Sequence, residues 1–218
     1  MTFTKDQLIA FVEKNKDQET INLSRKGIKK IPEGLFNNCP NLRVLYLDNN
    51  RIQALPPAFL EQCPNLRVLC LSNNKIQALP PTFLDQCPNL EWLYLHNNQI
   101  QALPPTFLEQ CPKLKELYLS NNQIQALPPT FLEQCPKLKE LTLDNNQIQA
   151  LPPTFLEQCP KLRWLYLERN CLDRLPSSLE GKEGILVNSE KVRKEIGARR
   201  DQKRKNWLHA DIAMIPEN

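Results

Sequence analysis

A 24-residue internal repeat constrains this chain more than any other feature of its sequence. Nearly the same text recurs from residue 42 onward, and residues 114–137, LKELYLSNNQIQALPPTFLEQCPK, are one copy. A degenerate copy precedes the series and a decayed one follows it, so the repeats cover residues 18–188. Such a repeat predicts one solenoid in which each turn contacts only its neighbours. Its register is set by leucines at Leu42, Leu66, Leu90, Leu114, Leu138 and Leu162.

The first half of each repeat predicts a short strand, because its LxxLxL pattern alternates with period two. In one copy Leu117 and Leu119 point inward, whereas Glu116 and Tyr118 point outward. An asparagine follows where the chain leaves the strand, and its amide can both donate to and accept from buried backbone groups. We therefore expect a hydrogen-bonded ladder of Asn50, Asn74, Asn98, Asn122, Asn146 and Asn170.

The second half of each repeat predicts an outer segment. Two successive prolines, such as Pro128 and Pro129, fix an extended path and remove donors, so the sheet cannot continue there. A proline can also open a short helical turn, and Phe131, Leu132 and Cys135 fit one face of such a turn. Because these outer segments need more room than the strands, the stack should curve.

The pattern LxxLxLxxNxIxxLPxxFxxCPx resembles the typical 24-residue class of leucine-rich repeats. The resemblance implies an α/β solenoid: a leucine-rich-repeat horseshoe arc with a parallel β-sheet on the concave face, short 3₁₀/α turns on the convex face, and helical caps at both ends. The near-identity of the copies is similar to that of bacterial leucine-rich-repeat proteins, including effectors of intracellular pathogens. A consensus-designed chain would share it, so both origins stay open.

Cysteine usage predicts a reduced protein. Six of the eight cysteines occupy one repeat position that closes an apolar stripe, where a small buried hydrophobe fits. Disulfides between successive turns or metal sites are the alternatives, but the sequence has no CxxC pair and no histidine cluster. We expect core packing, no metal and a cytoplasmic compartment. The six are Cys39, Cys63, Cys87, Cys111, Cys135 and Cys159.

Solenoid ends need covers, and residues 1–17 predict a helical cap at the N-terminus. Thr4 should cap a helix from Lys5 to about Lys14. The segment lacks the apolar core and cleavage site of a standard secretory signal, so we expect a cytoplasmic protein, or one delivered into a host cell without a standard signal peptide. The apolar side of this helix comprises Leu8, Ile9, Phe11 and Val12.

Residues 189–218 predict a basic helix or tail that follows a last edge strand over residues 184–187. Residues 191–205 hold eight basic and two acidic side chains. This segment is either a soluble helix beyond the cap or a binder of anionic membrane or nucleic acid. The net charge of +4 is too small to imply nucleic acid by itself, and no apolar run is long enough to span a bilayer.

No catalytic pattern is present in the sequence. The five glycines make neither a phosphate-binding loop nor a dinucleotide fingerprint, there is no HExxH, and only two histidines exist. The residues after the repeats are too few for the catalytic domain that the leucine-rich-repeat ubiquitin ligases of bacteria carry. We expect no enzyme, no cofactor and no small-molecule substrate.

The outward strand positions vary between repeats and predict a protein-binding surface on the concave face. One turn presents Trp92, Tyr94 and His96. Another turn, roughly 14 Å away by strand spacing, presents a second group of Trp164, Tyr166, Glu168 and Arg169. Aromatic residues dominate interface energetics, although they also favour strands. The partner would be a protein of unknown identity. If the chain is an effector, the partner would be a host protein. The candidate contacts are Tyr46, Trp92, Tyr94, His96, Glu116, Tyr118, Glu140, Trp164, Tyr166, Glu168 and Arg169.

Overall fold

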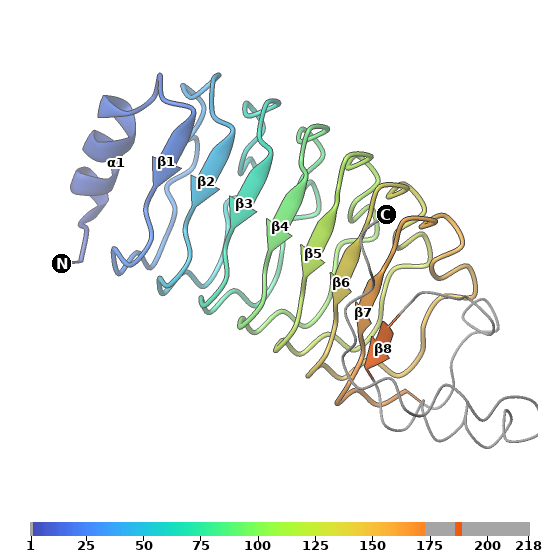
Figure 1. The fold of residues 1–218 in the computed structure, drawn as a ribbon. Helices are drawn as coiled ribbons and strands as arrows, with labels where there is room; N and C mark the ends of the chain where they lie inside the picture. Colours follow the sequence, from blue (N-terminus) through green and yellow to red (C-terminus); the bar gives the residue numbers. More distant parts are fainter. Residues whose placement is uncertain (1, 173–185, 189–218) are drawn as a thin grey trace, which may run out of the picture.

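The computed structural model describes residues 2–172 and 186–188, and these form a curved solenoid (Figure 1). Its strands make one parallel sheet in chain order. From β1 to β7 each residue pairs with the residue 24 positions later, as Leu93 does with Leu117, so the repeat length sets the register and the predicted solenoid is confirmed. The strands are β1 (Thr20–Asn22), β2 (Val44–Tyr46), β3 (Val68–Cys70), β4 (Trp92–Tyr94), β5 (Glu116–Tyr118), β6 (Glu140–Thr142), β7 (Trp164–Tyr166) and β8 (Leu186–Asn188).

Helix α1 (Lys5–Lys14) lies at the N-terminal end, over the residues predicted for it. Thr4 and Gln7 form a capping box, in which the Gln7 amide donates to the Thr4 hydroxyl at 3.2 Å. Leu8 and Val12 are buried because residues four apart share one helix face. The prediction that Ile9 belongs to the apolar side is wrong: one residue on, it turns away from the core and is 41% exposed.

The helix predicted after the last strand lies outside the described residues, as does the whole basic segment 189–218. The strand predicted over residues 184–187 lies at Leu186–Asn188 and pairs with β7. The boundaries at residues 17 and 188 stay predictions.

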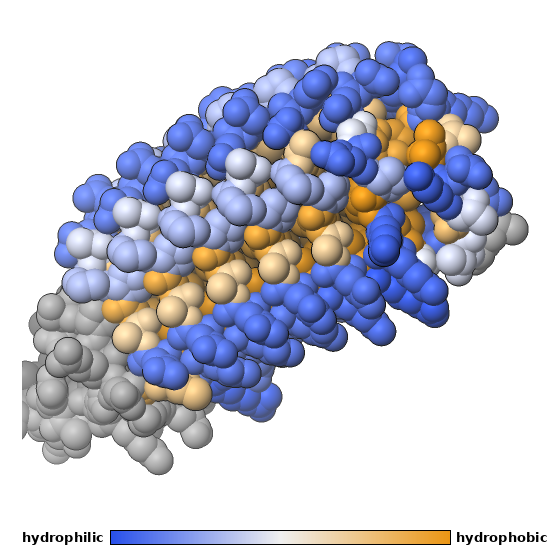
Figure 2. All heavy atoms as spheres, turned by 180° about the vertical axis from the view of Figure 1, so that it is seen from behind, coloured by the Kyte–Doolittle hydropathy of each residue, from blue (hydrophilic) through white to orange (hydrophobic). Residues whose placement is uncertain are grey.

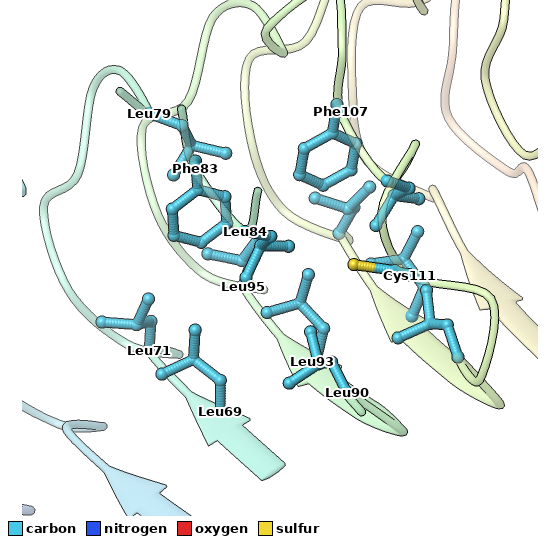
Figure 3. Close-up of a cluster of buried hydrophobic side chains, with 14 of the residues drawn as sticks. Leu69, Leu71, Leu79, Phe83, Leu84, Leu90, Leu93, Leu95, Phe107 and Cys111 are labelled. Atoms are coloured by element: carbon cyan, nitrogen blue, oxygen red, sulfur yellow. The ribbon is translucent and has the colours of Figure 1, made fainter. Parts of the chain in front are cut away.

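The core consists of the inward leucines of each strand and a column of phenylalanines behind them (Figure 3). Phe83, Phe107 and Phe131 stack with ring centroids 6.3 Å apart and planes within 5°. Parallel strands are only about 4.8 Å apart, so the outer side of each turn is the wider one. This difference gives the arc its predicted curvature.

The asparagine ladder is present as predicted, and Asn122 shows its geometry. Its amide nitrogen donates to the carbonyl oxygens of Leu95 and Leu119, both at 3.0 Å, and its Oδ1 accepts from the Ile100 amide at 3.0 Å. The residue before it, Asn121, has φ +55°. Asparagine tolerates this left-handed region better than most residues, so where two asparagines adjoin, as at Asn121 and Asn122, they have separate roles.

The convex segments are chains of hydrogen-bonded turns. The Phe131 amide donates to the Pro128 carbonyl, and the Cys135 amide donates to the Leu132 carbonyl, each at 3.0 Å. These i to i+3 bonds are those of 3₁₀ turns, but Leu132 has φ +73°, so no helix continues through it. That backbone costs about 1–2 kcal/mol, and burial of the leucine side chain, about 2 kcal/mol, offsets it.

Acidic residues form a solvated column on the outer side. Seen from behind, the surface shows a narrow apolar stripe between two hydrophilic bands (Figure 2). A lysine follows three of these acids four residues later, but the segments are not helical, and none of these three pairs forms an ion pair among the described residues. The acids are Glu61, Asp85, Glu109, Glu133 and Glu157.

The six repeat cysteines pack in the core, as predicted, and are at most 2% exposed. Burial, with a further contribution from the Asp85 charge, raises the pKa of Cys111 to about 12. Cys171, in contrast, is exposed. The thiolate is the reactive form of cysteine, so the core positions should be inert.

Iodoacetamide at about pH 8 should therefore modify Cys171 of the native chain and leave Cys111 unmodified, as read by peptide mass spectrometry. The chain unfolded in guanidinium should be labelled at both residues, which controls for detection. A Cys171→Ser variant should keep its core cysteines unmodified when folded. Rapid labelling of Cys111 in the native chain would contradict the burial described above.

Candidate functional site

Six of the candidate residues lie at outward positions of β4, β5 and β6 or, for His96, just after β4; these strands run side by side on the inner side of the arc (Figure 1). They were predicted to face solvent, but each is half-buried, because residues in register on neighbouring strands pack against one another. We call Trp92, Tyr94, His96, Glu116, Tyr118 and Glu140 the concave cluster.

Two tyrosines and a carboxylate form the centre of the concave cluster. The rings of Tyr94 and Tyr118 stack with centroids 5.0 Å apart and planes at 20°. Both hydroxyls donate to Oε2 of Glu116, at 3.4 Å and 3.3 Å. Burial and the Glu116 charge raise the pKa of Tyr94 to about 12, so this hydroxyl remains a donor at neutral pH. The Glu116 side chain is thereby held in one orientation.

His96 closes one side of the cluster. Its ring meets Tyr94 and Tyr118 edge-on, with centroids at 6.4 Å and 6.1 Å. Burial lowers the pKa of His96, although the charges of Asp144 and Asp48 oppose this, so the imidazole is neutral at pH 7. Within the described part of the chain, its buried Nδ1 has no hydrogen-bond partner. The imidazole therefore contributes its ring to the packing of the cluster rather than a polar contact for a partner.

Sequence reasoning missed Glu91 and Lys115, which support Trp92 from the edge of the sheet. Lys115 Nζ lies 4.9 Å from the Trp92 ring centroid and 2.5 Å from Glu91 Oε2. The two residues occupy the same repeat position in adjacent turns and carry opposite charges. This is the signal that could have found them, since residues in register on paired strands interact.

Glu140 lies beside Glu116 on the next strand, where their Cα atoms are partners in the sheet. Burial raises the pKa of Glu140, the nearby Tyr118 hydroxyl lowers it, and the Glu116 charge raises it further. Neither carboxylate makes an ion pair within residues 2–172. The centre of the concave face therefore carries two half-buried acids and no cation of its own.

Because the folded chain raises the pKa of Glu140, this carboxyl stabilises the fold fully only below its usual pKa of about 4.5. The contribution is lost as pH rises through the folded pKa. A Glu140→Gln variant should therefore lose less stability than the unchanged chain between acid and neutral pH, as measured by melting temperature. Glu109→Gln, on the convex side, controls for the loss of one charge. Parallel curves for all three chains would contradict this account.

The second predicted group is only partly assembled. Trp164 and Tyr166 of β7 are half-buried and follow Glu140 and Thr142 across the sheet. Glu168 is also half-buried, whereas Arg169 is exposed in the turn after the strand, where its guanidinium donates to Asn145 Oδ1 at 3.3 Å. Arg169 thus lies at the rim rather than on the sheet.

Tyr46 is separate from both groups. It lies on β2, half-buried, and its register partner on β3 is Cys70. Cys70 in turn partners Tyr94, so a full strand lies between the two tyrosines. Thr142 likewise separates Tyr118 from Tyr166, and it is 7% exposed. The aromatic column is thus continuous only from Tyr94 to Tyr118.

The described residues contain no group of three or more side chains placed to hold a metal ion. A cavity of about 220 Å³ lies on the other side of the molecule, lined by convex residues of two successive turns such as Phe59 and Gln86. No described helix has the length and apolar character to cross a membrane. What the concave cluster offers is aromatic surface and two half-buried carboxylates, of which Glu116 is held by the tyrosine hydroxyls.

Comparison with known proteins gives one result for the repeats. A family model described as "Leucine rich repeat" matches residues 19–76, 40–100, 64–124, 88–148, 112–172 and 136–183, overlapping windows that together span residues 19–183. No curated protein matches the chain.

Proposed function

Since the chain belongs to the leucine-rich-repeat family, we propose that it binds a partner protein on its concave face through the concave cluster. Leucine-rich repeats are generally protein-interaction scaffolds, and the fold is typically non-enzymatic. The observation that carries the proposal is the stacked Tyr94–Tyr118 pair beside Trp92 and His96 on one face. Tyrosine and tryptophan supply large contact areas at small entropic cost, and they are enriched among residues that dominate binding energy.

The repeats as a whole support a role as a binding scaffold, because the residues that are constant between repeats form the core. The inward leucines, the phenylalanine column and the asparagine ladder leave the outward strand positions free to vary. Variation at these positions changes the surface and leaves the packing untouched. Binding specificity can therefore reside in the concave columns alone.

The alternative function, charge-driven binding through the basic segment 189–218, concerns residues outside the described part of the chain. A salt series separates the two. Binding through the concave cluster should change little between low and moderate ionic strength, whereas tail-driven binding to a polyanion should fall steeply. Deletion of residues 199–218 should leave capture of a protein partner intact. Loss of capture on that deletion, together with a steep salt dependence, would favour the alternative.

We further propose a reduced, cytoplasmic setting, either in the producing cell or in a host that receives the protein. The buried thiols of the repeats support this, because a core of packed cysteines needs no oxidation to be stable. Bacterial origin and an effector role stay predictions from the near-identity of the repeats. Fractionation of cells that express the chain, with detection in cytoplasm and medium, measures the compartment directly.

A further inference from the structure

We propose that the concave face receives an arginine side chain of the partner, with the guanidinium between Glu116 and Glu140 and the aromatic rings beside it. This inference rests on the proposed function and names the chemistry of the partner at one position. It follows from three features of the described residues: two acids without an ion pair, a remaining acceptor atom on Glu116, and a ring that already holds a cation.

The first feature is the pair of acids. Glu116 and Glu140 are register partners on adjacent strands, half-buried, and without an ion pair among the described residues. Like charges directly opposite each other on a sheet destabilise it. Burial raises the pKa of Glu140, and the Glu116 charge adds to that rise. A cation placed between the two carboxylates would reverse the sign of the interaction.

The second feature is the way Glu116 is held. Tyr94 and Tyr118 both donate to its Oε2, and the described residues give no hydrogen bond to its Oε1. One oxygen is thus used to fix the side chain and the other remains an acceptor. A guanidinium has a planar fork of donors that can reach carboxylates on two strands about 4.8 Å apart, which a lysine ammonium cannot span as well.

The third feature is a cation that the face already binds. Lys115 lies over the Trp92 ring while its ammonium pairs with Glu91, so a ring and a carboxylate together hold one charge. Across the sheet, Trp164 is the register partner of Glu140. None of the described cations lies over the Trp164 ring. An arginine between the two acids would find a ring on each side.

The charge of the three outward columns favours such a partner. These columns of β2 to β7 carry Asp48, Glu116, Glu140, Asp144 and Glu168 and no lysine or arginine. The residues directly before the same strands are Glu91 and five cations: Arg43, Arg67, Lys115, Lys139 and Arg163. The acidic patch is therefore confined to the three outward columns, and a basic side chain of the partner would be attracted there.

The test is selection of linear peptides from a random display library on the full-length chain, and on a Glu116→Gln/Glu140→Gln variant. Peptides enriched on the unchanged chain should contain an arginine, and its replacement by alanine should weaken binding roughly tenfold to a hundredfold. A peptide with lysine in place of this arginine should bind more tightly than the alanine peptide but less tightly than the arginine peptide. The Glu116→Gln/Glu140→Gln variant should bind the arginine peptides as weakly as the unchanged chain binds the alanine peptides, because glutamine keeps the side-chain shape and removes the charge.

A Glu109→Gln/Glu133→Gln variant on the convex side, which loses the same charge, should bind the peptides as the unchanged chain does. Peptides that bind the unchanged chain and the Glu116/Glu140 variant equally would overturn the arginine site while leaving concave binding in place. Binding that is also insensitive to Trp92→Ala would overturn the proposed function as well. Melting temperatures of all variants separate lost binding from lost structure.

Discussion

Replacement of Asn122 by alanine is expected to lower the free energy of unfolding by about 3 kcal/mol. The side chain lies within the ladder, where Asn122 Oδ1 accepts from the buried Ile100 amide at 3.0 Å. That amide would lose its acceptor. The carbonyls of Leu95 and Leu119 would each keep one donor, from Asn98 and Asn146. Urea denaturation measures the loss.

Two further variants make this expectation specific. Asn122→Asp keeps the acceptor but sets a carboxylate against two carbonyl oxygens, so it should cost more than alanine at neutral pH and less in acid, where the carboxyl can donate. Asn121→Gly should cost little, because glycine takes the left-handed φ of +55° without strain. An Asn122→Ala chain as stable as the unchanged one would show that the ladder does not hold the turns together.

Replacement of Trp92 and Tyr94 together by alanine is expected to weaken partner binding about thirtyfold or more. Both rings lie in the concave cluster, and Tyr94 stacks on Tyr118 at 5.0 Å. Their removal takes away contact area and also releases Glu116, which Tyr94 helps to orient. The measurement is affinity capture with the unchanged and the variant chain, followed by titration of the partner obtained.

Half-burial of these rings means that the double variant should also lose some stability, through the Lys115 contact and the tyrosine stack. The loss should be small beside that of Asn122→Ala, because no buried backbone group is left unpaired. A Glu109→Ala/Gln110→Ala variant on the convex side provides the control for binding. Capture that survives Trp92→Ala/Tyr94→Ala in a folded chain would remove the concave cluster as the binding site.

The sequence predicted the cluster's members better than their surroundings. Trp92, Tyr94 and His96 were placed together because they alternate along one strand. Tyr118 was placed two strand positions after Glu116, but its stacking on Tyr94 could not be read from either repeat alone. Rotamers and ring contacts depend on what lies one turn away, 24 residues along the chain. The same holds for Lys115, which the repeat places at an edge and the packing places over Trp92.

Local sequence patterns also gave wrong predictions where tertiary packing determines the backbone conformation. Phe131, Leu132 and Cys135 have helical spacing, yet Leu132 adopts φ +73°. Its side chain is 2% exposed, so burial compensates for a conformation that a leucine seldom takes. For Ile9 the apolar character of the side chain predicted a core position, but its place on the helix exposes it to solvent.

The 24-residue period by itself determined the parallel sheet, its register, the buried leucines, phenylalanines and cysteines, and the asparagine ladder. It could do so because every turn repeats one local solution, and stacking identical turns brings identical positions together. Only the tertiary structure decided how side chains meet across turns: the tyrosine stack, the cation over Trp92, and the two tyrosine hydroxyls on Glu116. These contacts join positions at which the repeats differ, so their geometry depends on the packing of neighbouring turns.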